Sequence, residues 1–169
     1  MAEKTENTPL GPPERPVCEF ASDSLMHRLS ETIRGEVSAV PPLVERIMTF
    51  VDEMGCAVGQ EFEIRLAISE ALANAVEHGC QNDPSKRIQV CVECDPARGM
   101  LIVVRDPGQG FDPSQVPSPL EGEQLFSSGG RGIFLINQLM DEVHFHRGGT
   151  EIRMIKRDAG PGGAGGSEK

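Results

Sequence analysis

Hydrophobic and polar positions follow strand-like and helix-like spacing in turn over residues 27–157. Residues 27–37 alternate apolar and polar side chains, as a half-buried strand does, and predict a first strand. Residues 41–54 begin with two prolines and then carry apolar side chains at helical spacing, so they predict a helix. A second helix is predicted over residues 60–78, with Gly79 as its left-handed cap.

The second half of this region predicts two hairpins separated by a long loop and a third helix. In chain order these are strands 87–94 and 100–106, a Pro- and Gly-rich loop 107–129, a helix 133–143, and a hairpin 141–157 turning at Gly148-Gly149. This order is not a βαβ alternation. It predicts an α+β fold, a two-layer sandwich with helices on one face of a mixed, mostly antiparallel sheet.

Both ends of the chain differ in composition from this region. Residues 1–16 hold four of the 13 prolines, and residues 158–169 are rich in glycine, so both stretches are predicted to be disordered. Residues 17–26 leave two readings open, an extra strand or an arm. The predicted organisation is therefore a disordered segment or arm over 1–26, one domain over 27–157, and a disordered tail.

The charge of the chain excludes some partners. Lysine and arginine number 16 against 26 aspartates and glutamates, and the net charge of −10 repels phosphate backbones and anionic membranes. We therefore expect no direct nucleic-acid or membrane partner. The N-terminus has no apolar signal-like run, and the longest apolar runs are too short to cross a bilayer, so a cytoplasmic protein is predicted.

Five cysteines are scattered along the chain, an odd number without the spacing of a disulfide framework. Reduced thiols are therefore expected. Cys91 and Cys94 have C-x-x-C spacing, but they fall in a predicted strand, where residues three apart point to opposite faces. Buried structural thiols are favoured there over a zinc or redox site.

The second predicted helix carries a carboxylate and an amide among small neighbours. Its apolar side chains, from Ile64 to Ala75, gather on one side and predict the face that packs on the sheet. Glu70 and Asn74 lie four residues apart, away from that side, on a stripe with Glu63 and Glu77. A solvated helix face and a binding site are both open for this pair.

Two glycine clusters favour the binding site. Asp106-x-Gly108-x-Gly110 ends an apolar strand, and three glycines precede the third predicted helix. Glycines let a ligand approach the backbone, and N–H groups at a helix N-terminus bind anions. Each signal alone is weak, but together they predict a phosphate site. A P-loop and a Rossmann fingerprint are both absent from the sequence.

Three segments in this order, EALANAVEHG (70–79), DPGQG (106–110) and GGRGIFLI (129–136), resemble the nucleotide-binding boxes of the GHKL, or Bergerat-fold, ATPases. The chain is most similar to the anti-sigma-factor serine/threonine kinases of that superfamily. The resemblance covers about residues 27–157 and implies ATP and Mg²⁺ as cofactors.

The resemblance also implies roles for individual residues. Asn74 would hold Mg²⁺ through its amide oxygen. Glu70 would act as general base and accept the proton of an attacking hydroxyl. Asp106 would accept a hydrogen bond from the adenine amino group, assisted by Thr150. Loop 111–128 would be the ATP lid.

The glycine clusters would bind the remainder of the nucleotide. Gly108 and Gly110 would let the chain pass against it. His78 would lie near the phosphates, or would place a favourable charge at the helix C-terminus. The nucleotide-binding residues implied in the third segment are Gly129, Gly130, Arg131, Gly132 and Ile133, of which the central three would meet the triphosphate.

In this family a stand-alone domain is usually a homodimer. It sequesters a sigma factor and phosphorylates a serine or threonine of a small anti-anti-sigma antagonist of the STAS type. The resemblance implies both partners and the kinase activity for this chain. The alternative is an ATP-dependent binding module without phosphotransfer.

Overall fold

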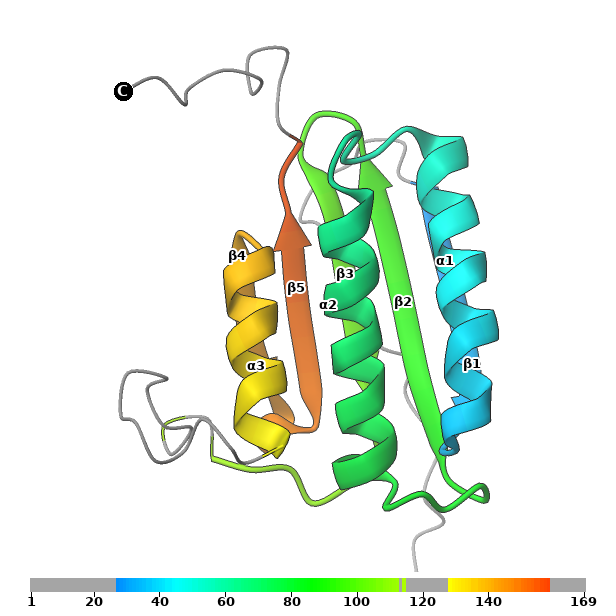
Figure 1. The fold of residues 1–169 in the computed structure, drawn as a ribbon, viewed down its shortest axis with the longest axis vertical. Coiled ribbons are helices and arrows are strands. Elements are labelled where there is room, and N and C mark those ends of the chain that lie inside the picture. Colours follow the sequence, from blue (N-terminus) through cyan, green and yellow to red (C-terminus); the bar gives the residue numbers. More distant parts are fainter. Residues whose placement is uncertain (1–26, 113, 115–127, 159–169) are drawn as a thin grey trace, which may run out of the picture.

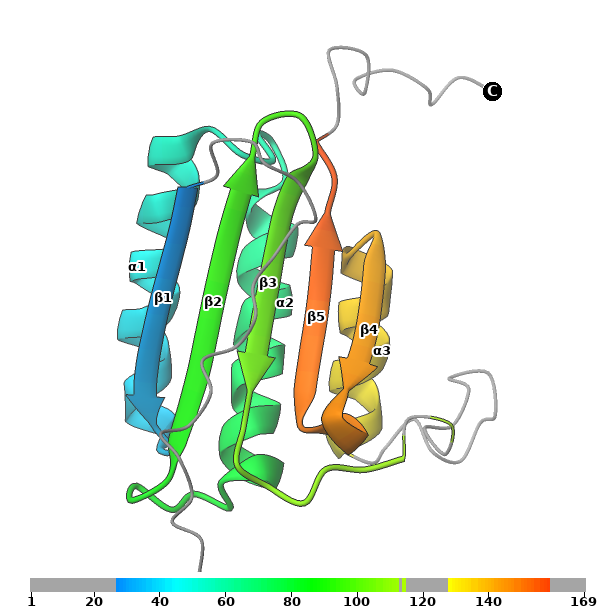
Figure 2. The ribbon, with the colours of Figure 1, turned by 180° about the vertical axis from the view of Figure 1, so that it is seen from behind.

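A computed structural model describes residues 27–112, 114 and 128–158 of the chain. Three α-helices cover one face of a five-stranded sheet, so the predicted two-layer α+β sandwich is confirmed (Figures 1 and 2). The elements are β1 (His27–Arg34), α1 (Val40–Met54), α2 (Glu61–Asn74), β2 (Arg87–Asp95), β3 (Gly99–Arg105), α3 (Ser128–Leu139), β4 (Glu142–His146) and β5 (Glu151–Lys156).

The sheet has the strand order β1-β2-β3-β5-β4, and each of its four pairings is antiparallel. The expected mixed sheet is therefore antiparallel throughout. β2–β3 and β4–β5 are the two predicted hairpins. β3 and β5 are also neighbours in the sheet, although α3 and β4 lie between them in the sequence. The central row of the register places Val92 opposite Ile102, and Ile102 opposite Met154.

α2 lies over the middle of the sheet, between α1 and α3 (Figure 1). Its predicted apolar face is confirmed, since Ile64, Ile68 and Leu72 are fully buried in the main core. Burial of such a side chain contributes about 1.5 to 3 kcal/mol. Because α2 is packed in this way, the side of the helix that carries Glu70 and Asn74 cannot rotate relative to the sheet.

Two helix boundaries differ from the prediction. α2 ends at Asn74 and is continued by a π-helical turn, Ala75–Gly79, in which the Cys80 N–H donates to the Ala75 carbonyl at 2.8 Å. α3 runs from Ser128 to Leu139 rather than over 133–143. It ends early because the Asp141 N–H already donates to Ile155 in the β4–β5 hairpin, at 2.9 Å.

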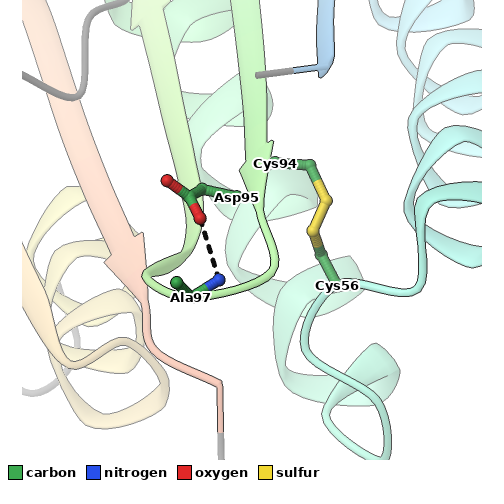
Figure 3. The surroundings of a disulfide bond; sticks show 4 residues. All are labelled: Cys56, Cys94, Asp95 and Ala97. Atoms are coloured by element: carbon green, nitrogen blue, oxygen red, sulfur yellow. Dashed lines mark hydrogen bonds between the residues drawn. A yellow bond between two sulfur atoms is a disulfide. The ribbon is translucent and has the colours of Figure 1, made fainter. Parts of the chain in front are cut away.

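A disulfide joins Cys56 to Cys94, so the expectation of reduced thiols is wrong for these two residues (Figure 3). The connection between α1 and α2 passes the end of β2 and brings the two Cα atoms to 6.0 Å. The two cysteines are 38 positions apart in the sequence, a separation that gave no recognisable disulfide spacing. Cys80 and Cys91 are free thiols, as expected, and both are buried, whereas Cys18 lies outside the described residues.

The predictions for the two ends of the chain are not tested by the structure. Residues 1–26 and 159–169 lie outside the described residues. In the described part, no helix is both long and apolar enough to cross a membrane. The same part contains no cluster of three or more histidine, cysteine, aspartate or glutamate side chains arranged to hold a metal ion.

Candidate functional site

The predicted site residues meet at one end of the sheet, where β3 and α2 end and α3 begins (Figure 1). Two contacts through glycine make this meeting visible. Gly132 of α3 lies against Glu70 and Asn74, and Gly79 after α2 lies against Asp106. The three sequence segments therefore form one region, as the resemblance implied.

Glu70 and Asn74 lie one helical turn apart on α2, and both are partly exposed. A Cβ at position 132 would lie 3.0 Å from Glu70 Oε2 and 3.1 Å from Asn74 Nδ2. Glycine is therefore the residue that allows α3 to approach this pair. Among the described residues, neither side chain makes a hydrogen bond, so their oxygens remain available to a ligand.

Asp106 follows β3, and its side chain packs against two glycines, Gly79 and Gly108. A Cβ on Gly79 would overlap the Asp106 carboxyl group, and the Gly108 N–H donates to Asp106 Oδ1 at 2.8 Å. Burial raises the pKa of Asp106, and the hydrogen bond from Gly108 opposes this in part. Within the described part of the chain, Oδ2 accepts no hydrogen bond and can accept one from a ligand.

Thr150 is tied to the same region through the backbone. The Asp106 N–H donates to the Thr150 carbonyl at 3.0 Å, which joins the end of β3 to the start of β5. The Thr150 hydroxyl donates to the Arg147 carbonyl at 3.0 Å, so only its oxygen lone pairs remain for a ligand. Gly110 packs against Gly148 and the Thr150 methyl group, because a Cβ there would meet both.

The third segment forms the start of α3. Gly129 and Gly130 lie in its first turn, where backbone N–H groups have no partner within the helix. Arg131 is exposed, Gly132 is buried and Ile133 is half-buried. The segment thus presents donors and one guanidinium group beside the carboxylate and amide of α2.

His78 is exposed in the π-helical turn. In the described part of the chain it makes no hydrogen bond or ion pair, so neither of its two predicted roles is tested. The predicted lid, loop 111–128, lies mostly outside the described residues.

Sequence reasoning missed the role of Gly79. The predicted left-handed cap is wrong, because Gly79 has no positive φ, and Gln81 and Asn82 take that conformation instead, at 56° and 57°. Gly79 has no side chain where Asp106 packs. The glycine that follows EALANAVEH was the visible sign of this contact, but its partner, Asp106, lies in a different segment of the sequence.

Comparisons with known proteins agree with this geometry. Residues 33–156 match the model of the histidine kinase-like ATPase domain. The chain is 38% identical over 100 residues to the serine-protein kinase RsbW of Staphylococcus epidermidis, which covers 54% of this chain and 62% of that relative. The chain thus spans less than two thirds of the length of that relative.

Two further relatives align over longer stretches. The serine-protein kinase RsbW of Bacillus subtilis is 27% identical over 142 residues, or 78% of this chain and 88% of the relative. The anti-sigma F factor of Anoxybacillus flavithermus is 28% identical over 115 residues, or 65% and 78%. With the family match over most of the core and the three segments brought together in space, the chain belongs to the histidine kinase-like ATPase domain family.

Proposed function

We propose that this protein is an ATP-dependent serine/threonine-protein kinase and anti-sigma factor. In this proposal it phosphorylates an anti-anti-sigma antagonist and holds a sigma factor. The observation that carries it is the placement of Gly132 against Glu70 and Asn74, because it sets a carboxylate and an amide oxygen beside the first turn of α3. The names of the relatives, serine-protein kinase and anti-sigma factor, support the same function.

The family implies ATP binding, and Asp106 is the proposed adenine-binding residue. Its Oδ1 is held by Gly108, while Oδ2 would accept a hydrogen bond from the adenine amino group. Guanine carries a carbonyl at the equivalent position and cannot donate this bond. Gly79 and Gly108 pack directly against the carboxyl group and so hold it at the end of β3.

The other end of the nucleotide would lie at α3 and α2. The first-turn N–H groups of α3 and Arg131 would bind the phosphates. Asn74 fits a Mg²⁺ ligand, because its side chain makes no hydrogen bond within the described residues and magnesium prefers oxygen ligands. When bound, the ion would neutralise charge on the phosphates.

Glu70 is the proposed general base. The hydroxyl oxygen of a substrate serine or threonine would form a bond to the γ-phosphorus, and the bond from that phosphorus to the bridging oxygen of ADP would break. The hydroxyl proton would pass to Glu70. The products are ADP and a phosphoprotein.

The partners follow from the same family relationship. We propose a sigma factor as the protein that is held, a STAS-type antagonist as the phosphorylated substrate, a homodimer as the active form, and the cytoplasm as the compartment. Phosphorylation would release the antagonist and leave the sigma factor bound again. In the alternative, ATP binding alone sets the shape of the protein and no phosphoryl group is transferred.

The variant Glu70→Gln tests the proposal, with Glu77→Gln as the matched control on the exposed side of the same helical segment. Each protein is incubated with Mg-ATP and a candidate antagonist, and phosphoprotein is measured by mass spectrometry. We expect Glu70→Gln to bind ATP normally but to lose phosphotransfer by about 100-fold or more. Glu77→Gln should retain it.

Phosphotransfer that persists in Glu70→Gln would refute the assigned base. If no antagonist is phosphorylated by the unaltered protein while ATP binding and sigma-factor capture are intact, the binding module without phosphotransfer is the correct function.

A further inference from the structure

The face of the sheet opposite the helices carries a buried apolar strip. The strip consists of Cys91, Leu101, Val103 and Ile155, from three adjacent strands. Cys91, Leu101 and Val103 are only 1%, 3% and 0% exposed. All the described helices lie on the other face (Figures 1 and 2).

Two ion-pair clusters flank the strip. Glu93 is fully buried and accepts from Arg28 Nε at 2.8 Å. Glu151 is also buried, and it accepts from Arg105 Nε at 2.7 Å and from Arg153 Nε at 2.9 Å. A sheet face open to water would leave such groups wet, so burial of both carboxylates indicates that this face is covered.

The register of β1 shows which part of the chain can reach the strip. His27 begins β1 opposite Cys94, and Arg28 lies in one row with Glu93 and Leu101. The chain therefore enters the sheet at His27, on the edge strand and beside the strip. Neighbouring strands are about 4.8 Å apart, so β5 lies about 15 Å from β1, whereas ten extended residues span about 33 Å.

The chemistry of residues 17–26 fits this surface. The segment VCEFASDSLM supplies Val17, Phe20, Leu25 and Met26 as apolar groups. Its charged side chains, Glu19 and Asp23, are both acidic, whereas the two clusters on the sheet carry four guanidinium groups against two carboxylates, because Arg147 also pairs with Glu151.

The other undescribed parts of the chain fit less well. Residues 159–169 contain no large apolar side chain. Residues 115–127 are joined to β3 and α3 at the nucleotide-binding end of the sheet, away from the row of Arg28.

We propose that residues 17–26 form an arm that packs across the back of the sheet and covers the apolar strip. The arm is then part of the folded domain, and this face is closed to other proteins while the arm is in place. The inference does not depend on the kinase activity.

Thiol labelling of the full chain tests the arm. In a Cys18→Ser background, a maleimide is added without reductant, and labelling of individual cysteines is followed by peptide mass spectrometry. Cys91 reports on the back of the sheet, while Cys80, buried on the helix side, is the internal control. We expect Phe20→Asp to accelerate labelling of Cys91 at least tenfold and to leave Cys80 unchanged.

Leu10→Asp, outside the proposed arm, is the matched control and should leave both rates unchanged. The milder Phe20→Ser is used if Phe20→Asp does not fold. An unchanged Cys91 rate in the Phe20 variant would overturn the proposal, and so would an equal rise at Cys80. A Cys91 rate that falls with increasing protein concentration would show instead that a second copy of the chain covers this face.

Discussion

Burial and the proposed binding of adenine would act in opposite directions on the Asp106 carboxylate. Burial raises its pKa, so the ionised form is less favourable in the folded protein than in the unfolded chain. Its contribution to stability therefore decreases as pH rises through the folded pKa. The same ionised form is the better hydrogen-bond acceptor for adenine, so this position is expected to serve binding at a cost in stability.

The substitution Asp106→Asn separates the two effects. We expect ATP affinity to fall about 10- to 100-fold, as for loss of a hydrogen bond to a charged group, while the melting temperature does not fall. Calorimetric titration with Mg-ATP and a thermal melt measure both quantities. Asp52→Asn on the exposed side of α1 is the control and should leave ATP affinity unchanged.

The pH dependence follows from the raised pKa. As the solution is acidified, the unaltered protein should begin to lose ATP affinity before the pH reaches the usual aspartate pKa of about 4. In Asp106→Asn this loss should disappear. An affinity that is the same in both proteins would show that Asp106 does not bind the base.

The contacts of single residues could be predicted only where both partners lie close together in the sequence. That Glu70 and Asn74 lie side by side could be predicted because both are on one helix, where four-residue spacing fixes their relation. The contact between Gly79 and Asp106 joins two segments distant in the chain, and no local pattern shows it. Gly79 was therefore assigned to a cap that the structure does not form.

At the scale of elements, periodicity predicted each helix and strand but not every end. α3 begins five residues before the apolar run that predicted it, since its first turn consists of serine and two glycines, which have low helix propensity. The π-helical turn after Asn74 has the same composition as an α-helix and leaves no sequence pattern. The disulfide depends on how the α1–α2 connection meets β2, which is a tertiary property.

The disulfide fixes the α1–α2 connection to the end of β2, and its reduction tests that link. Opening the Cys56–Cys94 bond should lower the free energy of unfolding by about 2 to 4 kcal/mol, because the unfolded chain gains the freedom of a long loop. Urea denaturation with and without dithiothreitol measures the difference. The double variant Cys56→Ser/Cys94→Ser should show no effect of dithiothreitol, and an effect of equal size there would exclude this disulfide as the cause.

At the scale of the whole molecule, the order of elements was sufficient to predict the two layers. Alternation gave the strands, helical spacing gave the buried face of α2, and short turns gave the two hairpins. The prediction that some strands pair in parallel was wrong. The direction in which β5 pairs with β3 depends on which edge of the sheet the last hairpin joins, and the sequence pattern does not show this. The candidate site could be predicted as a set of three segments. The packing of Gly79 and Gly108 against Asp106 became visible only in the three-dimensional structure.

Acid should weaken the sheet through Glu151. Burial acts to raise the pKa of this glutamate, but the hydrogen bonds from Arg105 and Arg153 outweigh it, and the pKa is lowered overall. Its contribution to stability is present above the unfolded-state pKa of about 4.3 and is lost as pH falls through the lower folded value. Stability should therefore decline below about pH 4.5.

Glu151→Gln should remove this part of the acid response and cost about 3 to 5 kcal/mol at neutral pH, because three guanidinium groups lose their charged partner. Urea denaturation across a pH series measures it. Glu142→Gln, which affects an exposed ion pair with Arg157, is the control and should leave stability nearly unchanged. A Glu151→Gln protein with the full acid response would rule out this carboxylate as its source.

The strand order has a consequence for synthesis on the ribosome. β5 is the last of the described strands to be made, yet it lies inside the sheet between β3 and β4. Among the described strands β4 pairs only with β5, so it cannot join the sheet until β5, which ends at Lys156, has left the exit tunnel. Because the Asp106 N–H is held by the Thr150 carbonyl, the end of β3 at which we propose adenine binding is completed at that same late moment. Nascent chains that are still attached at shorter lengths should therefore be unable to retain nucleotide.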